Sequence, residues 1–241
     1  MKSNKMKSNK MNTYRKTAIL VGVLFITATV ACSISIFLTE PILNAPDYLA
    51  KVSANASHII LAALLMLIDA IAVAAIAIVI FPVLKKHNAS LAHGYVGARI
   101  IESVFFIFYV IILLSVMTVG RDFITATPSE ASHFQTIGNA LMAVFDWTFT
   151  LGYGIVFTLS ALILNYSLFQ SKLVPRWLSI FGIVGAAFSL ILNLFKFYSI
   201  ELPEILDIVI AVQEMVLAVW LIIKGFDLSA IVSKSAQRNH G

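Results

Sequence analysis

The feature that most constrains this chain is a series of long apolar segments with few charged residues. Residues Thr17–Thr39, for example, form a run of 23 residues without a charge. A helix that crosses the roughly 30 Å hydrocarbon core of a bilayer needs about 20 mostly apolar residues. Strands of a membrane barrel alternate apolar and polar residues, whereas residues Ile71–Ile80 are apolar on every face. The pattern therefore predicts an all-α membrane protein.

The composition excludes the soluble alternatives. Of the 241 residues, 60% are hydrophobic and 12% are charged, against roughly 45–50% and about 25% in an average soluble domain. So few charges do not cover the surface of a globule, which excludes a soluble enzyme and a disordered chain. The single cysteine, Cys32, permits no intrachain disulfide and so excludes a secreted disulfide scaffold.

The apolar segments predict a six-transmembrane-helix bundle with short loops. We expect this domain to occupy residues 14–226, between a disordered basic tail at 1–13 and a C-terminal cytoplasmic tail at 227–241. No proline falls inside a predicted span, and Gly152 and Gly154 are expected to soften the fourth helix. The predicted spans are residues 17–39, 55–81, 96–118, 137–166, 177–195 and 204–223.

Lysine and arginine residues are distributed unevenly over the predicted loops. Thirteen lie in the two tails and in the second and fourth connections, and three, Lys51, Arg121 and Lys196, lie on the opposite side. Because cytoplasmic loops carry the excess of these residues, we expect both termini to be cytoplasmic. The net charge of +5 then indicates contact with anionic membrane lipids rather than nucleic acid. The expected interfacial anchors near cytoplasmic helix ends are Trp177, Trp220, Tyr95 and Arg176.

Ionisable residues inside the predicted spans are the candidates for function. A charge at the centre of a membrane helix costs roughly 2.5–3.5 kcal/mol, and such residues usually face a partner or a cavity. Glu102 lies three residues after Arg99, so the two side chains share a helix face. Glu214 lies on one stripe of the sixth span together with Glu204 and Asp207. The candidate intramembrane polar site comprises Arg99, Glu102, Glu214, Asp69, Gln213 and Asp146.

Two interpretations of these residues stay open. The acids outnumber the arginine, so either some acids are protonated, or a cation or a water-filled cavity compensates them. In a structural interpretation, Arg99, Glu102 and Glu214, with Asp69, form a polar network that locks the second, third and sixth helices together. In a functional interpretation, the same groups form a proton or cation relay, or the wall of a small-molecule cavity.

Glycine residues predict where helices approach closely. Gly94 and Gly97 begin the third span, Gly182 and Gly185 lie early in the fifth, and Gly22 has a comparable depth in the first. Small residues allow membrane helices to pack closely. We therefore expect contacts between the odd-numbered spans near the cytoplasmic side.

Three sequence motifs combine in a distinctive way: FPVLKKHN followed by GYVGARIIE, LVPRWLS, and QEMVLAVWLIIKGF. Together, over about Tyr14 to Phe226, they resemble a bacterial membrane-protein family catalogued as domain of unknown function 4386. The resemblance implies a bacterial six-helix protein and brings no established substrate, cofactor or catalytic residue. Its motifs include Arg99, Glu102 and Glu214, which the physical argument selects independently.

The sequence supports three functional hypotheses. We expect a non-enzymatic, multi-pass protein of the bacterial cytoplasmic membrane, with a buried acidic site that passes or senses a small solute or a proton. One alternative is a lipid-modifying intramembrane enzyme at the cytoplasmic leaflet, with Arg99 on a phosphate and Glu102 or Glu214 as the acid or base. The other is a regulatory or partner subunit without chemistry.

Other partners are less well defined by the sequence. The chain has no HExxH, GxSxG or Walker motif, so we expect neither a metal nor a cofactor. A homo-oligomer is compatible with so small a bundle, although no exposed stripe identifies an interface.

Overall fold

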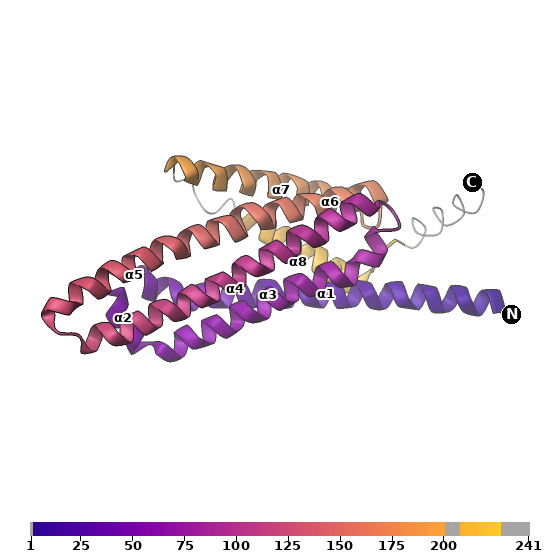
Figure 1. Cartoon of the computed structure of the whole chain (residues 1–241). Helices are drawn as coiled ribbons and strands as arrows, with labels where there is room; N and C mark the ends of the chain where they lie inside the picture. Colours follow the sequence, from indigo (N-terminus) through magenta and orange to yellow (C-terminus); the bar gives the residue numbers. More distant parts are fainter. Residues whose placement is uncertain (1, 201–207, 228–241) are drawn as a thin grey trace. The chain divides into compact units, whose positions relative to one another are not determined.

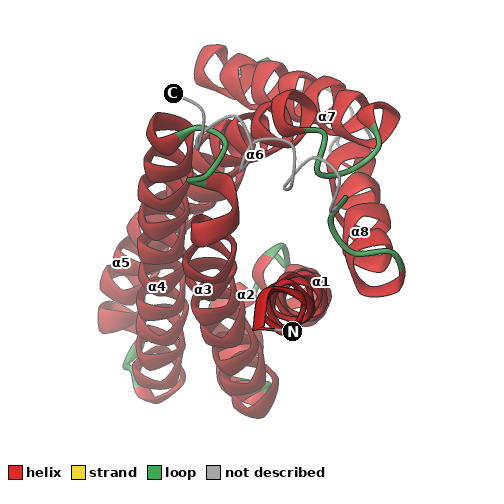
Figure 2. Ribbon diagram, turned by 90° about the vertical axis from the view of Figure 1, so that its right-hand side faces the viewer, coloured by secondary structure: helices red, strands yellow, loops and turns green. Residues whose placement is uncertain are grey.

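A computed structural model describes residues 2–200 and 208–227, with side chains from residue 11 onward. Within these ranges the chain is helical, and Figure 2 shows helices and loops without a strand. The all-α class is therefore confirmed for the described residues. The α-helices are α1 (Lys2–Leu43), α2 (Tyr48–Ala54), α3 (Ala56–Leu84), α4 (Ala89–Thr125), α5 (Pro128–Phe149), α6 (Thr158–Ser171), α7 (Arg176–Phe195) and α8 (Ile208–Ile223) (Figure 1). A π-helix at Thr150–Phe157 joins α5 to α6, and a 3₁₀ turn at Lys196–Tyr198 follows α7.

Five helical segments are long and apolar enough to cross a membrane. They are Met11–Leu43, Ala56–Leu84, Ala89–Thr125, Pro128–Ser171 and Arg176–Lys196. A shorter apolar helix, α8, follows them. The first part of the predicted sixth span, including Glu204 and Asp207, lies outside the described residues.

The helices extend beyond the apolar segments that predicted them. Helix α1 begins at Lys2, inside the tail that we expected to be disordered. Helices α1 and α3 also continue past Pro41 and Pro82, each of which lies near the C-terminal end of its helix. An apolar run marks only the part of a helix that must avoid water, so it sets no limit on the helix itself. The predicted domain boundaries stay a prediction.

The fourth apolar segment departs from a regular α-helix at the two glycines that were expected to soften it. Gly152 and Gly154 both lie in the π-helix. A Cβ at Gly152 would come within 2.6 Å of the Phe105 Cβ, and one at Gly154 would collide with Asn193 of α7. π-Bulges often accompany functional sites in helices. Here the absence of a Cβ at the two glycines leaves room for the side chains of Phe105 and Asn193.

The chain divides into two compact units. Among the described residues, unit 1 comprises 2–26, 72–100, 154–200 and 208–227, and unit 2 comprises 27–71 and 101–153. Helices α1, α3 and α4 and the π-helix each contribute residues to both units. Each unit therefore joins segments that are distant in sequence.

In unit 2, serine hydroxyl groups connect neighbouring helices. Ser35 of α1 donates a hydrogen bond to the Ala62 carbonyl of α3 at 2.9 Å. Ser103 of α4 donates to the Ala70 carbonyl of α3 at 2.7 Å. Hydrogen bonds of this kind and small interfacial residues hold membrane helices together, because lipid supplies no hydrophobic force between them.

In unit 1, α7 runs back alongside α6 (Figure 1), and two glycine–asparagine contacts join α7 to α6 and to the π-helix that precedes it. The position of a Cβ at Gly182 of α7 is occupied by Asn165 of α6, and Gly154 faces Asn193 of α7 in the same way. Each asparagine donates its amide to the carbonyl four residues earlier on its own helix. The amide oxygen is thereby held toward the partner helix.

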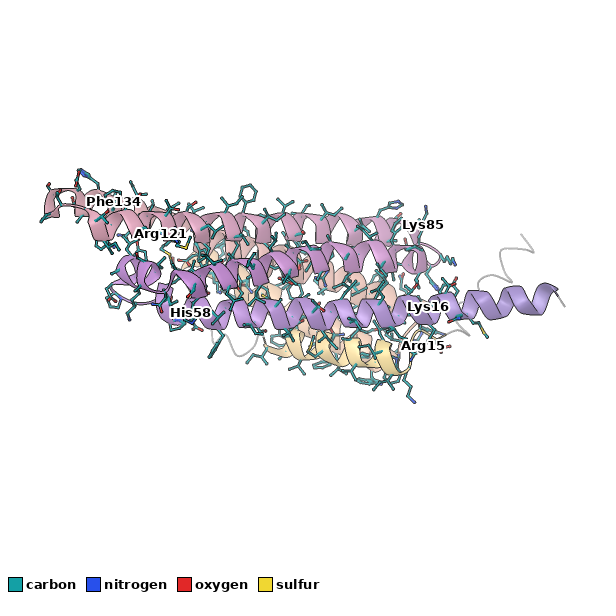
Figure 3. All side chains as sticks on the ribbon, turned by 90° about the horizontal axis from the view of Figure 1, so that it is seen from below. Arg15, Lys16, His58, Lys85, Arg121 and Phe134 are labelled. Carbon is teal, nitrogen blue, oxygen red and sulfur yellow. The ribbon has the colours of Figure 1, made fainter. Side chains whose placement is uncertain are left out.

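The C-terminal end of α8 is capped by an arginine from α1. Arg15 donates hydrogen bonds to the carbonyls of Leu221, Ile222 and Ile223 at 3.1, 2.6 and 3.1 Å. These carbonyls have no partner within the helix, and they carry the negative end of the helix dipole. Gly225, with φ of +76°, then turns the chain away in a conformation that disfavours other residues. Figure 3 shows Arg15 beside the last turns of α8.

We expect Arg15→Met to lower the free energy of unfolding by about 1.5–3 kcal/mol, because three carbonyls lose a charged donor. Methionine keeps an apolar stem of similar length. Thermal unfolding in detergent, followed by circular dichroism, measures the change. Lys16→Met is the matched control, since Lys16 is exposed on the next position of the same helix. Equal effects of both substitutions would contradict the capping role.

Candidate functional site

The centre of the candidate site is an ion pair buried in unit 1. The Arg99 Nη2 of α4 donates to the Glu214 Oε1 of α8 at 3.0 Å. Arg99 is 2% exposed and Glu214 is 8% exposed. The structure thus brings together two of the predicted site residues that are 115 positions apart in the chain.

Aromatic rings enclose the guanidinium group of Arg99. Its Cζ lies 5.6 Å from the ring centre of Phe25, 5.5 Å from that of Tyr95 and 5.4 Å from that of Phe157. The Tyr95 hydroxyl also accepts a hydrogen bond from the Arg99 Nε at 3.1 Å. A cation over an aromatic face is stabilised by the ring quadrupole, and more strongly where water is excluded. The rings come from α1, α4 and the π-helix, so the cation holds three segments together.

An amide cluster lies next to this pair on α8. Gln213 is fully buried, and its Nε2 donates to the Asn165 Oδ1 at 3.0 Å and to the Leu178 carbonyl at 3.3 Å. The Gln213 Oε1 and the Ser179 hydroxyl have no hydrogen-bond partner in the described part of the chain. Consecutive residues of α8 therefore present an amide to α6 and α7 and a carboxylate to α4.

Asp69 and Glu102 belong to unit 2. Asp69 of α3 is 3% exposed, and Glu102 of α4 is 1% exposed. Asp69 directly precedes Ala70, and Glu102 directly precedes Ser103. The Ser103 hydroxyl donates a hydrogen bond to the Ala70 carbonyl. The two acids therefore lie at the same level of α3 and α4. The sequence predicted their burial, and these helices hold them away from the surface.

Asp146 differs from the buried position that we expected for it. It is exposed on α5. The neighbouring Phe145 is buried and lies with its ring centre 4.3 Å from that of Tyr109. The apolar run around Asp146 does not specify which face of the helix is turned inward. In the structure the face that carries Phe145 is turned inward, and Asp146 lies on the exposed face.

The two members of the buried pair differ in whether they can change charge. An arginine side chain stays charged throughout the physiological pH range, whereas a carboxylate can take up a proton. In the pair, Glu214 is the group that can change its charge. The loss of that charge removes the partner of a buried cation, and breaking a buried pair in this way is strongly unfavourable.

The comparisons place this site in a family. The family model described as Domain of unknown function (DUF4386) matches residues 20–225, which is most of the chain. The chain belongs to the DUF4386 family. No curated protein and no solved structure matches the chain. The resemblance that the three motifs carry is confirmed, and Arg99, Glu102 and Glu214 of this DUF4386 protein all lie inside the matched range.

Of the predicted interfacial anchors, Tyr95 has a different position. It is fully buried against Arg99, one turn away on the same helix, and so belongs to the candidate site. Trp177 is 55% exposed, and its ring lies 6.4 Å from that of Trp220 and nearly perpendicular to it. Arg176 is exposed, with its guanidinium 5.3 Å from the ring centre of Phe169.

Several residues of the site escaped prediction. The four-residue spacing between Tyr95 and Arg99 was a usable signal, since such residues are neighbours on a helix. Asn165 was a second signal, because an amide inside an apolar segment needs a partner. Phe25 and Phe157 carried no signal, since aromatic residues are common throughout the apolar segments of this DUF4386 protein.

The remaining chemistry of the described residues is limited. They contain no group of three or more histidine, cysteine, aspartate or glutamate residues that could hold a metal ion. Arg99 is enclosed and paired, so it does not present the open, lipid-facing guanidinium that the lipid-phosphate alternative requires.

Proposed function

We propose that this DUF4386 protein is a multi-pass membrane protein that responds to protons through the buried Arg99–Glu214 pair. The observation that carries the proposal is an ion pair of 3.0 Å whose two side chains are almost inaccessible. Ionisable residues within membrane helices commonly belong to proton relays or to ligand sites. A proton, rather than a larger solute, fits a pair that the surrounding side chains enclose.

The proposal includes a topology. Helix α8 is the sixth span, both termini are cytoplasmic, and the protein resides in the bacterial cytoplasmic membrane. The support is the excess of lysine and arginine on one side. In unit 1, Arg15, Lys16 and Lys85 lie toward the same end, as Figure 3 shows. Membrane lipids, and a second copy of the chain, are the partners that this topology allows.

When Glu214 takes up a proton, Arg99 loses its counter-charge among three aromatic rings. Breaking a buried ion pair costs about 3–5 kcal/mol. A shift of roughly 5.5 kcal/mol converts a 1:99 equilibrium into 99:1. The energy of the broken pair is somewhat smaller than this, so one proton would shift the balance between two positions of α8 substantially but not completely.

We expect acidification of the wild type to change the fluorescence of Trp177 and Trp220, because α8 carries both Glu214 and Trp220. The measurement uses a Trp147→Phe background in lipid nanodiscs, which leaves only these two of the three tryptophans. Glu214→Gln should abolish the pH-dependent change. Glu40→Gln, the same neutralisation at an exposed acid, should leave it unchanged. A response that is identical in all variants would contradict proton sensing at Glu214.

A flux measurement decides whether protons also pass through the protein. Vesicles that contain the protein and a pH-sensitive dye are given a pH gradient. Faster dissipation by the wild type than by Glu214→Gln would extend the proposal from sensing to transport. No difference at any gradient would restrict the protein to sensing.

A second candidate function is a regulatory subunit without chemistry, in which the pair is a structural lock. The observation in its favour is the enclosure of Arg99 by rings from three segments. In that case Glu214→Gln lowers the folding yield, and the folded fraction shows the same fluorescence at every pH as the wild type.

A further inference from the structure

Unit 1 contains a basic pocket that is separate from the Arg99–Glu214 pair. It has a volume of about 440 Å³ and lies between the turn that joins α6 to α7 and the segment that follows α8. The Asp227 N–H donates to the Leu173 carbonyl at 2.8 Å and holds these two segments together. A backbone hydrogen bond therefore joins the two segments that line the pocket.

Positive charge predominates in this pocket. Lys172, Arg176 and Lys224 contribute three cations to its lining, and Asp227 contributes one acid. Lys172, Arg176 and Lys224 are exposed, so their charged groups are available to a ligand. An anion is the complementary ligand for such a lining.

Two helix ends strengthen the attraction for an anion. The N-terminus of α7 lies at the pocket, where Pro175 occupies the N-cap and provides no side-chain cap. Helix N-termini attract anions through their free N–H groups and the helix dipole. The C-terminus of α8 would oppose this effect, but Arg15 neutralises its carbonyls.

An apolar groove of about 380 Å³ adjoins the pocket and shares Trp220 and Lys224 with it. The groove is otherwise lined by Met215, Val216, Val219 and Ile223, which lie on one face of α8. Eight residues of helix span about 12 Å along the axis. The groove therefore leads from the basic pocket into the part of α8 that is proposed to lie in the membrane.

We propose that the pocket and the groove together bind one anionic phospholipid. Its phosphate lies among Lys172, Arg176 and Lys224, and one of its acyl chains follows α8. Trp220 lies at the junction and its ring is next to that of Trp177, as aromatic residues lie at the level of lipid headgroups. Basic pockets on the cytoplasmic side of membrane helices are suited to such headgroups. This inference does not depend on the proton response of Glu214.

Tryptophan quenching by brominated lipids tests the proposal. The full chain with Trp147→Phe is placed in phosphatidylcholine vesicles that contain increasing amounts of brominated phosphatidylglycerol or brominated phosphatidylcholine. We expect the anionic lipid to quench Trp177 and Trp220 preferentially. Removal of one cation should lower this preference by about fivefold, since each lysine or arginine near an anionic surface contributes on the order of 1 kcal/mol.

Matched variants separate the pocket from general electrostatics. Lys172→Gln with Lys224→Gln should remove most of the preference. Lys16→Gln with Lys85→Gln removes the same charge outside the pocket lining and should preserve it. Val219→Phe fills the groove without a change of charge and should also lower the preference. Circular dichroism verifies that each variant is folded.

Three results would overturn the proposal. The first is equal quenching by both brominated lipids in the wild type. The second is an equal loss of preference in the two double variants, which would indicate a general surface effect. The third is displacement of the brominated phosphatidylglycerol by millimolar inorganic phosphate. That result would identify the pocket as a site for soluble phosphate.

Discussion

Glu214→Leu is expected to lower the free energy of unfolding by about 3–5 kcal/mol, because the substitution leaves Arg99 buried without a counter-charge. Arg99 is 2% exposed, and its guanidinium donates to Glu214 at 3.0 Å. Few proteins tolerate so large a loss, since total stabilities are about 5–15 kcal/mol. Thermal and denaturant unfolding in detergent, followed by circular dichroism, measures the change.

The double variant Arg99→Met with Glu214→Leu should recover most of the loss. Both charges are then absent, and apolar residues of similar volume often replace a buried ion pair without a loss of stability. Glu40→Leu is the control for removal of an exposed acid. A double variant that is less stable than Glu214→Leu alone would contradict the interpretation, because Arg99 would then stabilise the fold without its partner.

The double variant also distinguishes a purely structural role of the ion pair from a role in proton sensing. If the pair is only a lock, the double variant restores the folding yield and every other property. If the pair responds to protons, the double variant is stable, but its tryptophan fluorescence no longer changes with pH. The same protein preparation therefore distinguishes the two candidate functions.

Gly22→Ala is expected to destabilise the protein by about 1–3 kcal/mol, the usual cost of an overpacked contact. A Cβ at Gly22 would lie 2.6 Å from the Ala218 carbonyl oxygen and 2.7 Å from the Ile222 Cγ1. The oxygen belongs to the backbone of α8, so α1 and α8 would have to separate. Unfolding in detergent measures the effect.

Gly97→Ala provides a matched control for Gly22→Ala. No atom lies within 4 Å of a Cβ at Gly97, and alanine has a higher helix propensity than glycine by about 1 kcal/mol. We therefore expect Gly97→Ala to be neutral or slightly stabilising. A comparable loss of stability in both variants would show that the close contact at Gly22 is not the cause.

The glycines show how far helix contacts could be predicted from the sequence. Gly22, Gly182 and Gly185 do lie at close helix contacts, but their partners are α8 and α6 rather than another odd-numbered span, so the expected pairing of odd-numbered spans is wrong for these glycines. Gly94 has only an ordinary contact, and Gly97 has none. Spacing along one helix shows that a close approach is allowed, but the position of the second helix decides whether it occurs.

The sequence by itself determined the class of the protein and most of its apolar segments. Each segment that crosses hydrocarbon must by itself avoid charges and unpaired backbone groups, because both are unfavourable there. The membrane-spanning segments can therefore be predicted without knowledge of their neighbours. The same local cost singled out Arg99 and Glu214. Their burial could be expected because an unpaired charge in an apolar helix is unfavourable wherever the helix lies.

Only the tertiary structure decided which residues meet. It placed Glu214 against Arg99, moved Tyr95 from the expected interface into the core, and left Asp146 exposed. The physical reason is that both faces of these helices are apolar. Phe37 and Ile71 are 77% and 63% exposed, whereas similar residues such as Phe25 and Ile76 are buried. A helix that is apolar toward lipid and toward protein carries no periodic signal of its inner face, and only the contacts with other helices identify it.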